Sequence, residues 1–536
     1  MKNISLLSIK LKHFIFSILI LYSCDKAPEI STIETLALIP YPNEILSTNM
    51  ALDISSISGI AGDDKTLNVY EIIKKEWEDL KAEETKNKSW YLKKRSIHLN
   101  IENNNDSSSK EAYSLEIKRD GIIIKSSDSE GIYRGWQSLS QIIKLRKNTS
   151  NPNYIPTGLI IDNPEYEYRG TMLDVSRHFF DLTEVKRHID LISNYKINYL
   201  HLHLSDDQGW RIEIKSWPKL TIIGSKTEVG GGIGGFYSQE DYIDIVNYAA
   251  SKFITIVPEI DIPGHTNSAL ASYSNLNCDG KLRELYTGTR VGFSTLCNNE
   301  YAFKFLDDVI REISAITPGP YFHIGGDESY VTSRSDYLEF ISKATKIVRK
   351  YDKTVIGWDD INAGDIPENS VLQLWNVTQQ EQSSTTDGDY QNKALTNVLN
   401  GLKKGSKVLI SPAALVYLDM KYDSLTKLGL NWAGYIDVKK GYDWKIEESF
   451  PELPKDKIIG IEAPLWSETI TNSNEIDFLA FPRLTGYAEI GWTKANNRNW
   501  QSYKERLAKH SRLWKQSKVN YYASPLINWA IEKEID

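Results

Sequence analysis

The stretch His323-Ile-Gly-Gly-Asp-Glu328 starts in a short apolar segment and ends in two adjacent carboxylates. Similar apolar segments recur from residue 168 onward and alternate with amphipathic stretches such as 183–195 and 301–316, whose apolar residues have helical spacing. This alternation implies crossover connections and a parallel sheet, and eight parallel strands close a barrel. The predicted strands are 170–173, 197–204, 254–257, 321–324, 354–357, 371–374, 407–410 and 458–461. The sequence therefore predicts an α/β fold with a (β/α)8 TIM barrel.

The region before the barrel has a different pattern. Short alternating segments at 96–101, 113–118 and 121–126 are separated by Asn, Ser, Asp and Gly, and a helical pattern follows at 131–145. These features predict a small α+β domain. We divide the chain into a signal peptide (1–24), an amino-terminal α+β accessory domain (25–161) and the barrel (162–536).

Composition narrows the class of function. The 536 residues are 41% hydrophobic and 25% charged, which is typical of a globular protein, and the formal net charge is -8. Because the chain has no basic surplus, we expect no nucleic-acid partner. Fourteen Trp and thirty Tyr provide many flat rings suited to sugar faces, although most rings in any protein belong to its core.

The amino terminus resembles an export signal. Lys2, Lys10 and Lys12 precede the apolar stretch 14–21, which is too short for a membrane-spanning helix. Leu21-Tyr-Ser-Cys24 then resembles a bacterial lipobox, in which the Cys24 thiol receives the lipid. We expect export across the inner membrane and anchoring in the periplasm or at the surface of a bacterium, with this lipid as the only membrane contact. Ordinary cleavage, with Cys24 removed or left free, is the alternative.

Two further cysteines remain if Cys24 carries lipid. Cys278 and Cys297 flank a polar, Gly-containing stretch. In an oxidising compartment such a pair is able to close a loop, and we predict a disulfide between them.

Polar or aromatic residues follow every predicted strand. The carboxyl ends of barrel strands meet on one face, where active sites are built, so these residues should converge there. A single carboxylate of this kind is more often a loop cap or a solvated charge, but all eight strand ends share the pattern. In chain order the residues are Asp174, Arg177, Asp206, Asp207, Glu259, Asp261, His265, Asp327, Glu328, Trp358, Trp375, Tyr417, Asp419, Glu462, Trp466 and Glu468.

Metal or cofactor chemistry has little support in the sequence. His201, His203 and His323 lie inside apolar segments, where we expect core histidines whose hydrogen bonds are satisfied. No H-E-x-x-H motif or Cys/His cluster with zinc spacing occurs in the chain. We expect no metal and no organic cofactor.

A mouth rich in carboxylates and aromatic rings indicates carbohydrate chemistry. Glycoside cleavage usually uses two carboxylates on opposite sides of the bond. If the strand continued through Asp327 and Glu328, their side chains would point to different sides and could not flank one bond. An N-acetyl group on the substrate could then supply the missing nucleophile, as in substrate-assisted glycosidases.

Several motifs in order resemble glycoside hydrolase family 20, the β-N-acetylhexosaminidases. They are His323-Ile-Gly-Gly-Asp-Glu328, Arg169-Gly-Thr-Met-Leu-Asp174, His201-Leu-His-Leu-Ser-Asp-Asp-Gln-Gly-Trp-Arg211, Pro258-Glu-Ile-Asp-Ile-Pro-Gly-His265 and Leu465-Trp-Ser-Glu468. Ile39-Pro-Tyr-Pro-Asn43 and Gly131-Ile-Tyr-Arg-Gly-Trp-Gln-Ser-Leu139 resemble the family's accessory domain. The resemblance implies hydrolysis of terminal N-acetylhexosamine units from glycans with retention of configuration.

The resemblance also implies a role for each matched residue. Glu328 is the general acid and base, Asp327 orients the substrate amide, and Tyr417 hydrogen-bonds its oxygen. Other matched residues surround these three. Trp358, Trp375, Trp466 and, less directly, Trp432 enclose the sugar; Arg177, Asp419 and Glu468 hold its hydroxyls; Asp206, Asp261 and His265 support the catalytic pair.

Some features remain open at this level. Asp359-Asp360 departs from the glutamates of many relatives, and 379–391 is a polar excursion on the rim. A lacto-N-biosidase-like release of a disaccharide and a non-catalytic, glycan-binding surface lipoprotein are the alternatives. The choice between GlcNAc and GalNAc, the natural glycan and the oligomeric state stay undetermined.

Overall fold

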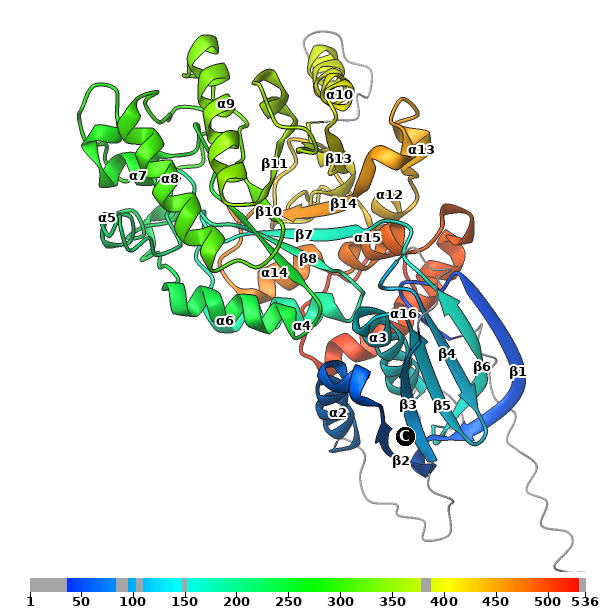
Figure 1. Ribbon diagram of the computed structural model, residues 1–536. Helices are drawn as coiled ribbons and strands as arrows, with labels where there is room; N and C mark the ends of the chain where they lie inside the picture. Colours follow the sequence, from blue (N-terminus) through cyan, green and yellow to red (C-terminus); the bar gives the residue numbers. More distant parts are fainter. Residues whose placement is uncertain (1–35, 83–94, 103–108, 147–151, 377–386, 530–536) are drawn as a thin grey trace, which may run out of the picture.

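The computed structural model describes residues 36–82, 95–102, 109–146, 152–376 and 387–529. They form a barrel ringed by helices and, beside it, a smaller domain built on an open sheet (Figure 1). Cys24, with the predicted signal peptide, and most of the excursion 379–391 lie outside the described residues. In the described part of the chain, no helix combines the length and apolar character needed to span a bilayer.

The barrel is closed by eight parallel strands, which confirms the predicted fold class. Each predicted strand is present, and β14 pairs with β7 to close the ring, with Glu462 beside Gly170. The strands are β7 (Tyr168–Asp174), β8 (Tyr199–His203), β9 (Thr255–Glu259), β10 (Tyr321–His323), β11 (Thr354–Trp358), β12 (Val371–Leu374), β13 (Lys407–Ile410) and β14 (Ile458–Leu465).

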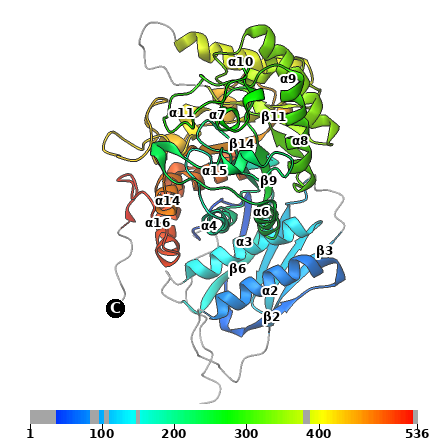
Figure 2. The ribbon, with the colours of Figure 1, turned by 90° about the vertical axis from the view of Figure 1, so that its left-hand side faces the viewer.

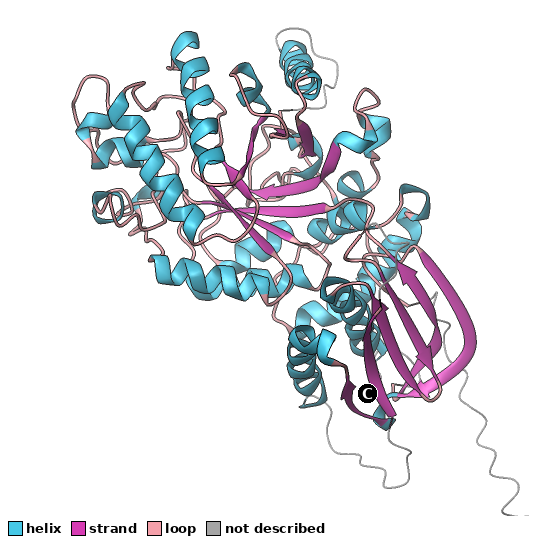
Figure 3. Cartoon of the chain, viewed as in Figure 1, coloured by secondary structure: helices cyan, strands magenta, loops and turns pink. Residues whose placement is uncertain are grey.

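Helices surround the barrel, as the secondary-structure colours of Figure 3 show. The helix predicted at 183–195 begins one residue earlier, where Asp181 and Glu184 form a capping box that fixes the first turn. The main helices are α4 (Leu182–Ser193), α6 (Gln239–Ala250), α8 (Glu300–Ala315), α9 (Arg334–Lys350), α10 (Asp387–Lys403), α14 (Ser473–Ala480), α15 (Arg483–Trp492) and α16 (Trp500–Gln516). Shorter helices are α5 (Lys219–Ile222), α7 (Asn267–Ser272), α11 (Ala413–Val416), α12 (Val438–Tyr442) and α13 (Ile446–Ser449).

The smaller domain is a six-stranded sheet in the order β1-β6-β4-β5-β3-β2, with α2 and α3 packed on it (Figure 2). The predicted segments correspond to β3, β4, β5 and α3, whereas β1, β2, β6 and α2 were not identified. The elements are β1 (Glu44–Asp53), β2 (Ile57–Ala61), α2 (Leu67–Ala82), β3 (Arg95–Ile101), β4 (Tyr113–Lys118), β5 (Gly121–Ser126), α3 (Ser129–Leu145) and β6 (Tyr154–Asp162). Two of the missed strands carry atypical patterns, since β1 is largely exposed and β6 contains Pro and Gly.

The barrel interior is layered. At the amino ends of the strands, a cluster that includes Tyr168, Val257 and Leu409 closes the bottom, and the rings of Tyr168 and Tyr199 stack 4.0 Å apart. The layer above is ionic. We expected His201, His203 and His323 to be core histidines whose hydrogen bonds are satisfied. All three are buried, and each lies against a carboxylate.

Glu259 is the centre of that ionic layer. Its carboxylate lies 3.0 Å from Nε2 of His201 and 2.9 Å from Nδ1 of His323, and it also pairs with His203. Glu462 accepts from Nδ1 of His201 at 2.9 Å. Despite the contact with Glu259, Nε2 of His201 makes no well-formed hydrogen bond among the described residues, and neither does Nε2 of His323. The prediction of satisfied histidines was therefore wrong for these two, whereas both nitrogens of His203 have partners.

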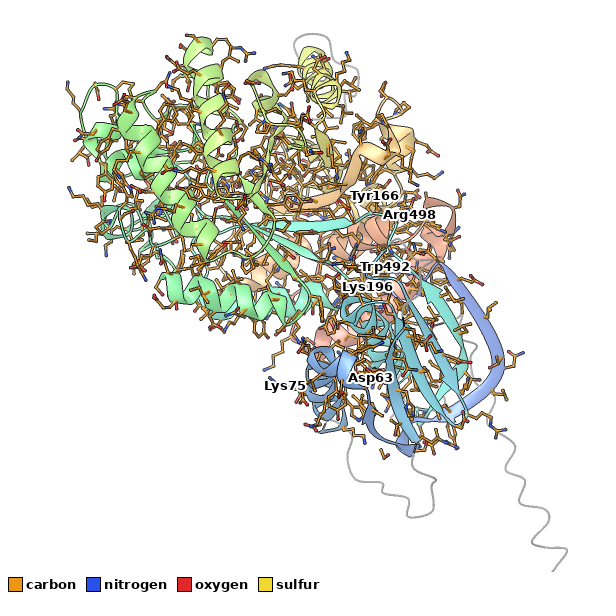
Figure 4. All side chains as sticks on the ribbon, in the orientation of Figure 1. Asp63, Lys75, Tyr166, Lys196, Trp492 and Arg498 are labelled. Carbon is orange, nitrogen blue, oxygen red and sulfur yellow. A yellow bond between two sulfur atoms is a disulfide. The ribbon has the colours of Figure 1, made fainter. Side chains whose placement is uncertain are left out.

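A second set of buried charges joins the two domains. Glu111 lies 2.7 Å from Nε of Arg134 on α3 and 2.6 Å from Nη2 of Arg169 on β7. Nearby, Lys196 contacts Asp162 at 3.3 Å and lies 4.3 Å from the ring of Trp492; Figure 4 labels Lys196 and Trp492 at this junction. The predicted disulfide between Cys278 and Cys297 is present and closes a loop on the barrel.

Removing Glu111 should destabilise this junction strongly. Glu111→Ala leaves two buried guanidinium groups without their carboxylate, and breaking a buried ion pair costs roughly 3–5 kcal/mol. The free energy of unfolding in urea should fall by that amount. Glu116→Ala, on β4 close to Glu111, removes an exposed ion pair with Lys118 and should leave the free energy of unfolding unchanged. Equal stability of the two variants would contradict the assignment.

Candidate active site

The Asp327–Glu328 pair lies in a tight turn beyond β10. The strand ends at His323, and Gly325, Gly326 and Glu328 have φ values of +60°, +103° and +46°. A Cβ on Gly325 would come within 1.8 Å of Oδ1 of Asp261, so only glycine fits there. The premise that both carboxylates continue the strand was therefore wrong, and side-chain alternation does not set their directions.

Hydrogen bonds hold this turn in place. The amide of Gly326 donates to Oδ1 of Asp261 at 3.0 Å, and the hydroxyl of Tyr337 donates to the carbonyl of Gly326 at 2.5 Å. A left-handed conformation costs a residue such as Glu328 about 1–2 kcal/mol, so these contacts have to offset local strain.

His265 contacts both carboxylates of the pair. Its Nε2 lies 3.8 Å from Oδ2 of Asp327 and 3.4 Å from Oε2 of Glu328, while Nδ1 lies 3.2 Å from Oδ1 of Asp206. Burial opposes its protonation, yet the charges of Asp206 and Asp261 raise the pKa of His265 well above its usual value. The imidazole is therefore a cation beside Asp327 and Glu328.

Asp206 connects this histidine to the ionic layer below. Its Oδ2 lies 2.8 Å from Nη2 of Arg177 and 2.7 Å from Nε2 of His203. Despite complete burial, Arg177 and His265 hold the pKa of Asp206 well below its usual range. Asp206 is thus a permanent anion that fixes both Arg177 and His265.

Asp327 is buried, and the pKa of its carboxyl is unusually high. Burial raises the pKa of its carboxyl to about 7, and the His265 cation opposes the rise. Burial and the neighbouring charge of Asp327 also raise the pKa of Asp261 well above normal. An oxygen of each of these two carboxyls and a nitrogen of His265 all lie within 4.8 Å of one another, so mutual repulsion makes it unfavourable for both carboxyls to be ionised.

Aromatic rings from four strand ends form a cage next to the pair. Centroid distances are 6.1 Å for Trp358–Trp375, 5.8 Å for Trp358–Trp466, 6.3 Å for Tyr417–Trp466 and 5.9 Å for Tyr417–Trp432. Trp358 and Tyr417 are buried, whereas Trp432 is 49% exposed at the mouth. The structure thus brings together the five rings that the sequence analysis singled out.

Polar groups line the other side of the cage. The guanidinium of Arg177 lies 4.8 Å above the ring of Trp466. Neither carboxylate oxygen of Asp419, nor Oε2 of Glu468, accepts a well-formed hydrogen bond from the described residues, although all are buried. Burial raises the pKa of both groups. A buried carboxylate oxygen without a hydrogen-bond donor is energetically unfavourable. A ligand rich in hydroxyl groups would supply the missing donors.

Some residues at the site carry no sequence-based prediction of a role. The hydroxyl of Tyr330 donates to Oε1 of Glu328 at 3.2 Å, and Nε1 of Trp375 donates to Oδ2 of Asp360 at 3.4 Å. Position alone could have indicated Tyr330, because it lies two residues after Glu328. Asp360, which departs from the family pattern, thus contacts a ring of the cage.

Comparison with known proteins identifies relatives along most of the chain. The pattern of the glycosyl hydrolase family 20 catalytic domain matches residues 166–495, and that of domain 2 of the same family matches 35–163. A beta-N-acetylhexosaminidase of Cellulomonas fimi is 38% identical over 421 residues, which cover 78% of this chain and 82% of that protein.

Solved structures give the same relationship. The N-acetyl-beta-hexosaminidase of Streptomyces plicatus, in complex with Thio-NAglucal, superposes with a TM-score of 0.86 at 40% identity, covering 94% of this chain and 100% of that one. An exo beta-N-acetylglucosaminidase of Vibrio harveyi, in complex with N-acetylglucosamine, has a TM-score of 0.76 at 29% identity, covering 92% and 80%.

Removing the His265 cation should raise the pKa of Asp327 further above about 7, because burial would act on the carboxyl without an opposing positive charge. We expect His265→Asn to extend the protonated form of Asp327 to higher pH. Difference infrared spectroscopy of the carboxyl band, assigned with Asp327→Asn, measures this. His98→Asn, an exposed histidine on β3, is the control. A downward shift in His265→Asn would refute the electrostatic role.

Proposed function

The chain belongs to glycosyl hydrolase family 20, and from that premise we propose that it is a β-N-acetylhexosaminidase acting on terminal N-acetyl-D-hexosamine residues of glycans. Hydrolysis proceeds with retention of configuration, by substrate-assisted catalysis. The geometry of the site supports the following roles for the individual side chains.

One observation carries the mechanism: Asp327 and Glu328 both lie against a single imidazole, at 3.8 and 3.4 Å. In ordinary retaining enzymes, acid and nucleophile face each other across the scissile bond, about 5–5.5 Å apart. Two adjacent carboxylates that share one partner do not span a bond in that way. The nucleophile is therefore the carbonyl oxygen of the substrate's own acetamido group.

In the first step, Glu328 protonates the bridging oxygen while the acetamido oxygen attacks C1. The bond from C1 to the leaving group breaks, and a positively charged oxazolinium ring forms. The Asp327 carboxylate orients the amide nitrogen and stabilises this positive charge, for which it must be ionised. The His265 cation, which opposes the rise in the pKa of Asp327, supports that requirement.

In the second step, the Glu328 carboxylate takes a proton from water, whose oxygen attacks C1 and opens the ring. The sugar leaves with its original configuration, because two inversions have occurred. Tyr417 donates a hydrogen bond from its hydroxyl to the acetamido oxygen, and the cage of Trp358, Trp375 and Trp466 encloses the acetamido methyl and the ring face. Asp419, Glu468 and Arg177 hold the sugar hydroxyls.

Replacing Glu328 by Gln should strongly reduce turnover without abolishing binding. A general acid–base group accelerates a reaction about 100- to 10,000-fold. We therefore expect kcat for β-GlcNAc and β-GalNAc aryl glycosides to decrease by a factor in that range. Calorimetric binding of a thiazoline mimic of the cyclised intermediate should persist. Comparing the wild-type turnover of the β-GlcNAc glycoside with that of the β-GalNAc glycoside also shows which orientation of the 4-hydroxyl the enzyme prefers.

Two results would count against this mechanism. Unchanged hydrolysis by Glu328→Gln would remove Glu328 from the chemistry. Failure of the thiazoline to inhibit the wild-type enzyme would exclude the acetamido group as nucleophile.

We also propose that Cys24 is lipidated and anchors the enzyme to a bacterial membrane after export, on the basis of the Leu21-Tyr-Ser-Cys24 motif. The expressed wild-type chain should partition into the detergent phase of a Triton X-114 extraction, and Cys24→Ala should partition into water. Activity on a soluble substrate should be equal in both. Aqueous partitioning of the wild type would refute the anchor.

A further inference from the structure

Tyr330 lies beside the acid, at the rim of the site. Its side chain is 69% exposed, which is unusual for so large a ring. The hydroxyl donates to Oε1 of Glu328 at 3.2 Å, and the backbone amide donates to the carbonyl of Glu328 at 2.7 Å. Tyr330 is therefore bonded to the acid through both its side chain and its backbone.

The other side of the ring faces the loop closed by the disulfide. A Cβ on Gly292, whose φ is +75°, would come within 2.1 Å of the Tyr330 ring and 2.9 Å of the carbonyl oxygen of Glu328. Gly292 thus provides a flat backbone surface under the ring. Because Cys278 and Cys297 close this loop, the support has a covalent tie at its base.

Hydroxyl groups fasten the two segments together. Oγ1 of Thr332 lies 2.7 Å from Oγ1 of Thr295, on the disulfide loop, and 2.6 Å from Oγ of Ser329. These bonds fix the backbone on both sides of Tyr330. The ring is exposed, yet it stands on a supported segment.

The two oxygens of Glu328 face different partners. Oε2 lies 3.4 Å from His265, inside the site, and Oε1 lies 3.2 Å from the exposed Tyr330. The acid has to reach the bridging oxygen, which joins the enclosed terminal sugar to a leaving group outside the cage. The exposed group next to Oε1 therefore adjoins the leaving group.

We propose that Tyr330 has two functions: its hydroxyl is a positioning group for Glu328, and its exposed ring is the platform of a subsite for the sugar ring of the leaving group. This inference rests on the proposed function. Aromatic faces pack well against the apolar faces of sugar rings. Partial removal from water and the charge of Glu328 raise the pKa of Tyr330, so the hydroxyl stays protonated and able to donate.

The test compares Tyr330→Phe and Tyr330→Ala on three β-linked GlcNAc substrates. The 2,4-dinitrophenyl glycoside has a leaving group that needs little protonation. The methyl glycoside needs a proton but presents no ring. The β-1,4-linked GlcNAc disaccharide needs a proton and presents a sugar ring.

The two variants should separate the hydroxyl from the ring. Tyr330→Phe should lower kcat/KM, which reports the steps up to departure of the leaving group, about 10-fold for the methyl glycoside and the disaccharide, as expected for loss of one hydrogen bond to a charged group. It should leave kcat/KM of the dinitrophenyl glycoside within about twofold. Tyr330→Ala should in addition raise KM about fivefold for the disaccharide alone. Gly292→Ala, which displaces the ring, should reproduce the loss in kcat/KM.

Tyr70→Phe on α2, in the smaller domain, is the matched control and should change none of these constants. Equal fractional losses of Tyr330→Phe on all three substrates, or no loss, would overturn the positioning role. Equal KM values of Tyr330→Phe and Tyr330→Ala for the disaccharide would overturn the platform. A wild-type enzyme that hydrolyses none of the three would overturn the proposed function and this inference with it.

Discussion

The buried charge of Glu259 is the constraint on which the barrel interior and the active site both depend. A carboxylate with no exposure to water has to be compensated, and His201, His203 and His323 surround it. The charge of Glu259 contributes to raising the pKa of His201 to about 10 and that of His203 to about 9, against the opposing effect of burial. Losing Glu259 would therefore leave buried cations unpaired, which is a strongly destabilising change.

This ionic layer continues into the catalytic site through one residue. His203 contacts Glu259 with one nitrogen and Asp206 with the other, and Asp206 in turn holds Arg177 and His265. His201, His203 and Glu259 lie on barrel strands, where packing restricts side-chain motion. The position of Glu328, the acid that we propose, is thus set by rigid elements through a chain of charged contacts, which is how active sites are kept preorganised.

The turn that carries Asp327 and Glu328 stores strain next to this rigid layer. Left-handed backbone at Glu328 is held by the contacts of Gly326 with Asp261 and Tyr337. His265 also has a positive φ, of 54°, and faces the turn from the neighbouring strand end. Two strained residues that follow adjacent strands, His265 and the proposed acid Glu328, therefore meet here. Their neighbours determine the local geometry more than their own backbone preferences do.

Local sequence pattern determined the eight barrel strands, their order, and the residues that follow them, because strand and helix periodicities are read within about ten residues. It also determined four of the five rings of the cage, since every strand end in a barrel points to one face, whereas Trp432 was indicated only by the family resemblance. Tertiary structure alone decided that β10 stops at His323, which turned Asp327 and Glu328 toward one imidazole. Likewise, only closure of the barrel and docking of the loop at 278–297 placed Tyr330 on Gly292 and paired Glu111 with Arg169. Such contacts join residues far apart in the chain, and short-range periodicity carries no information about them.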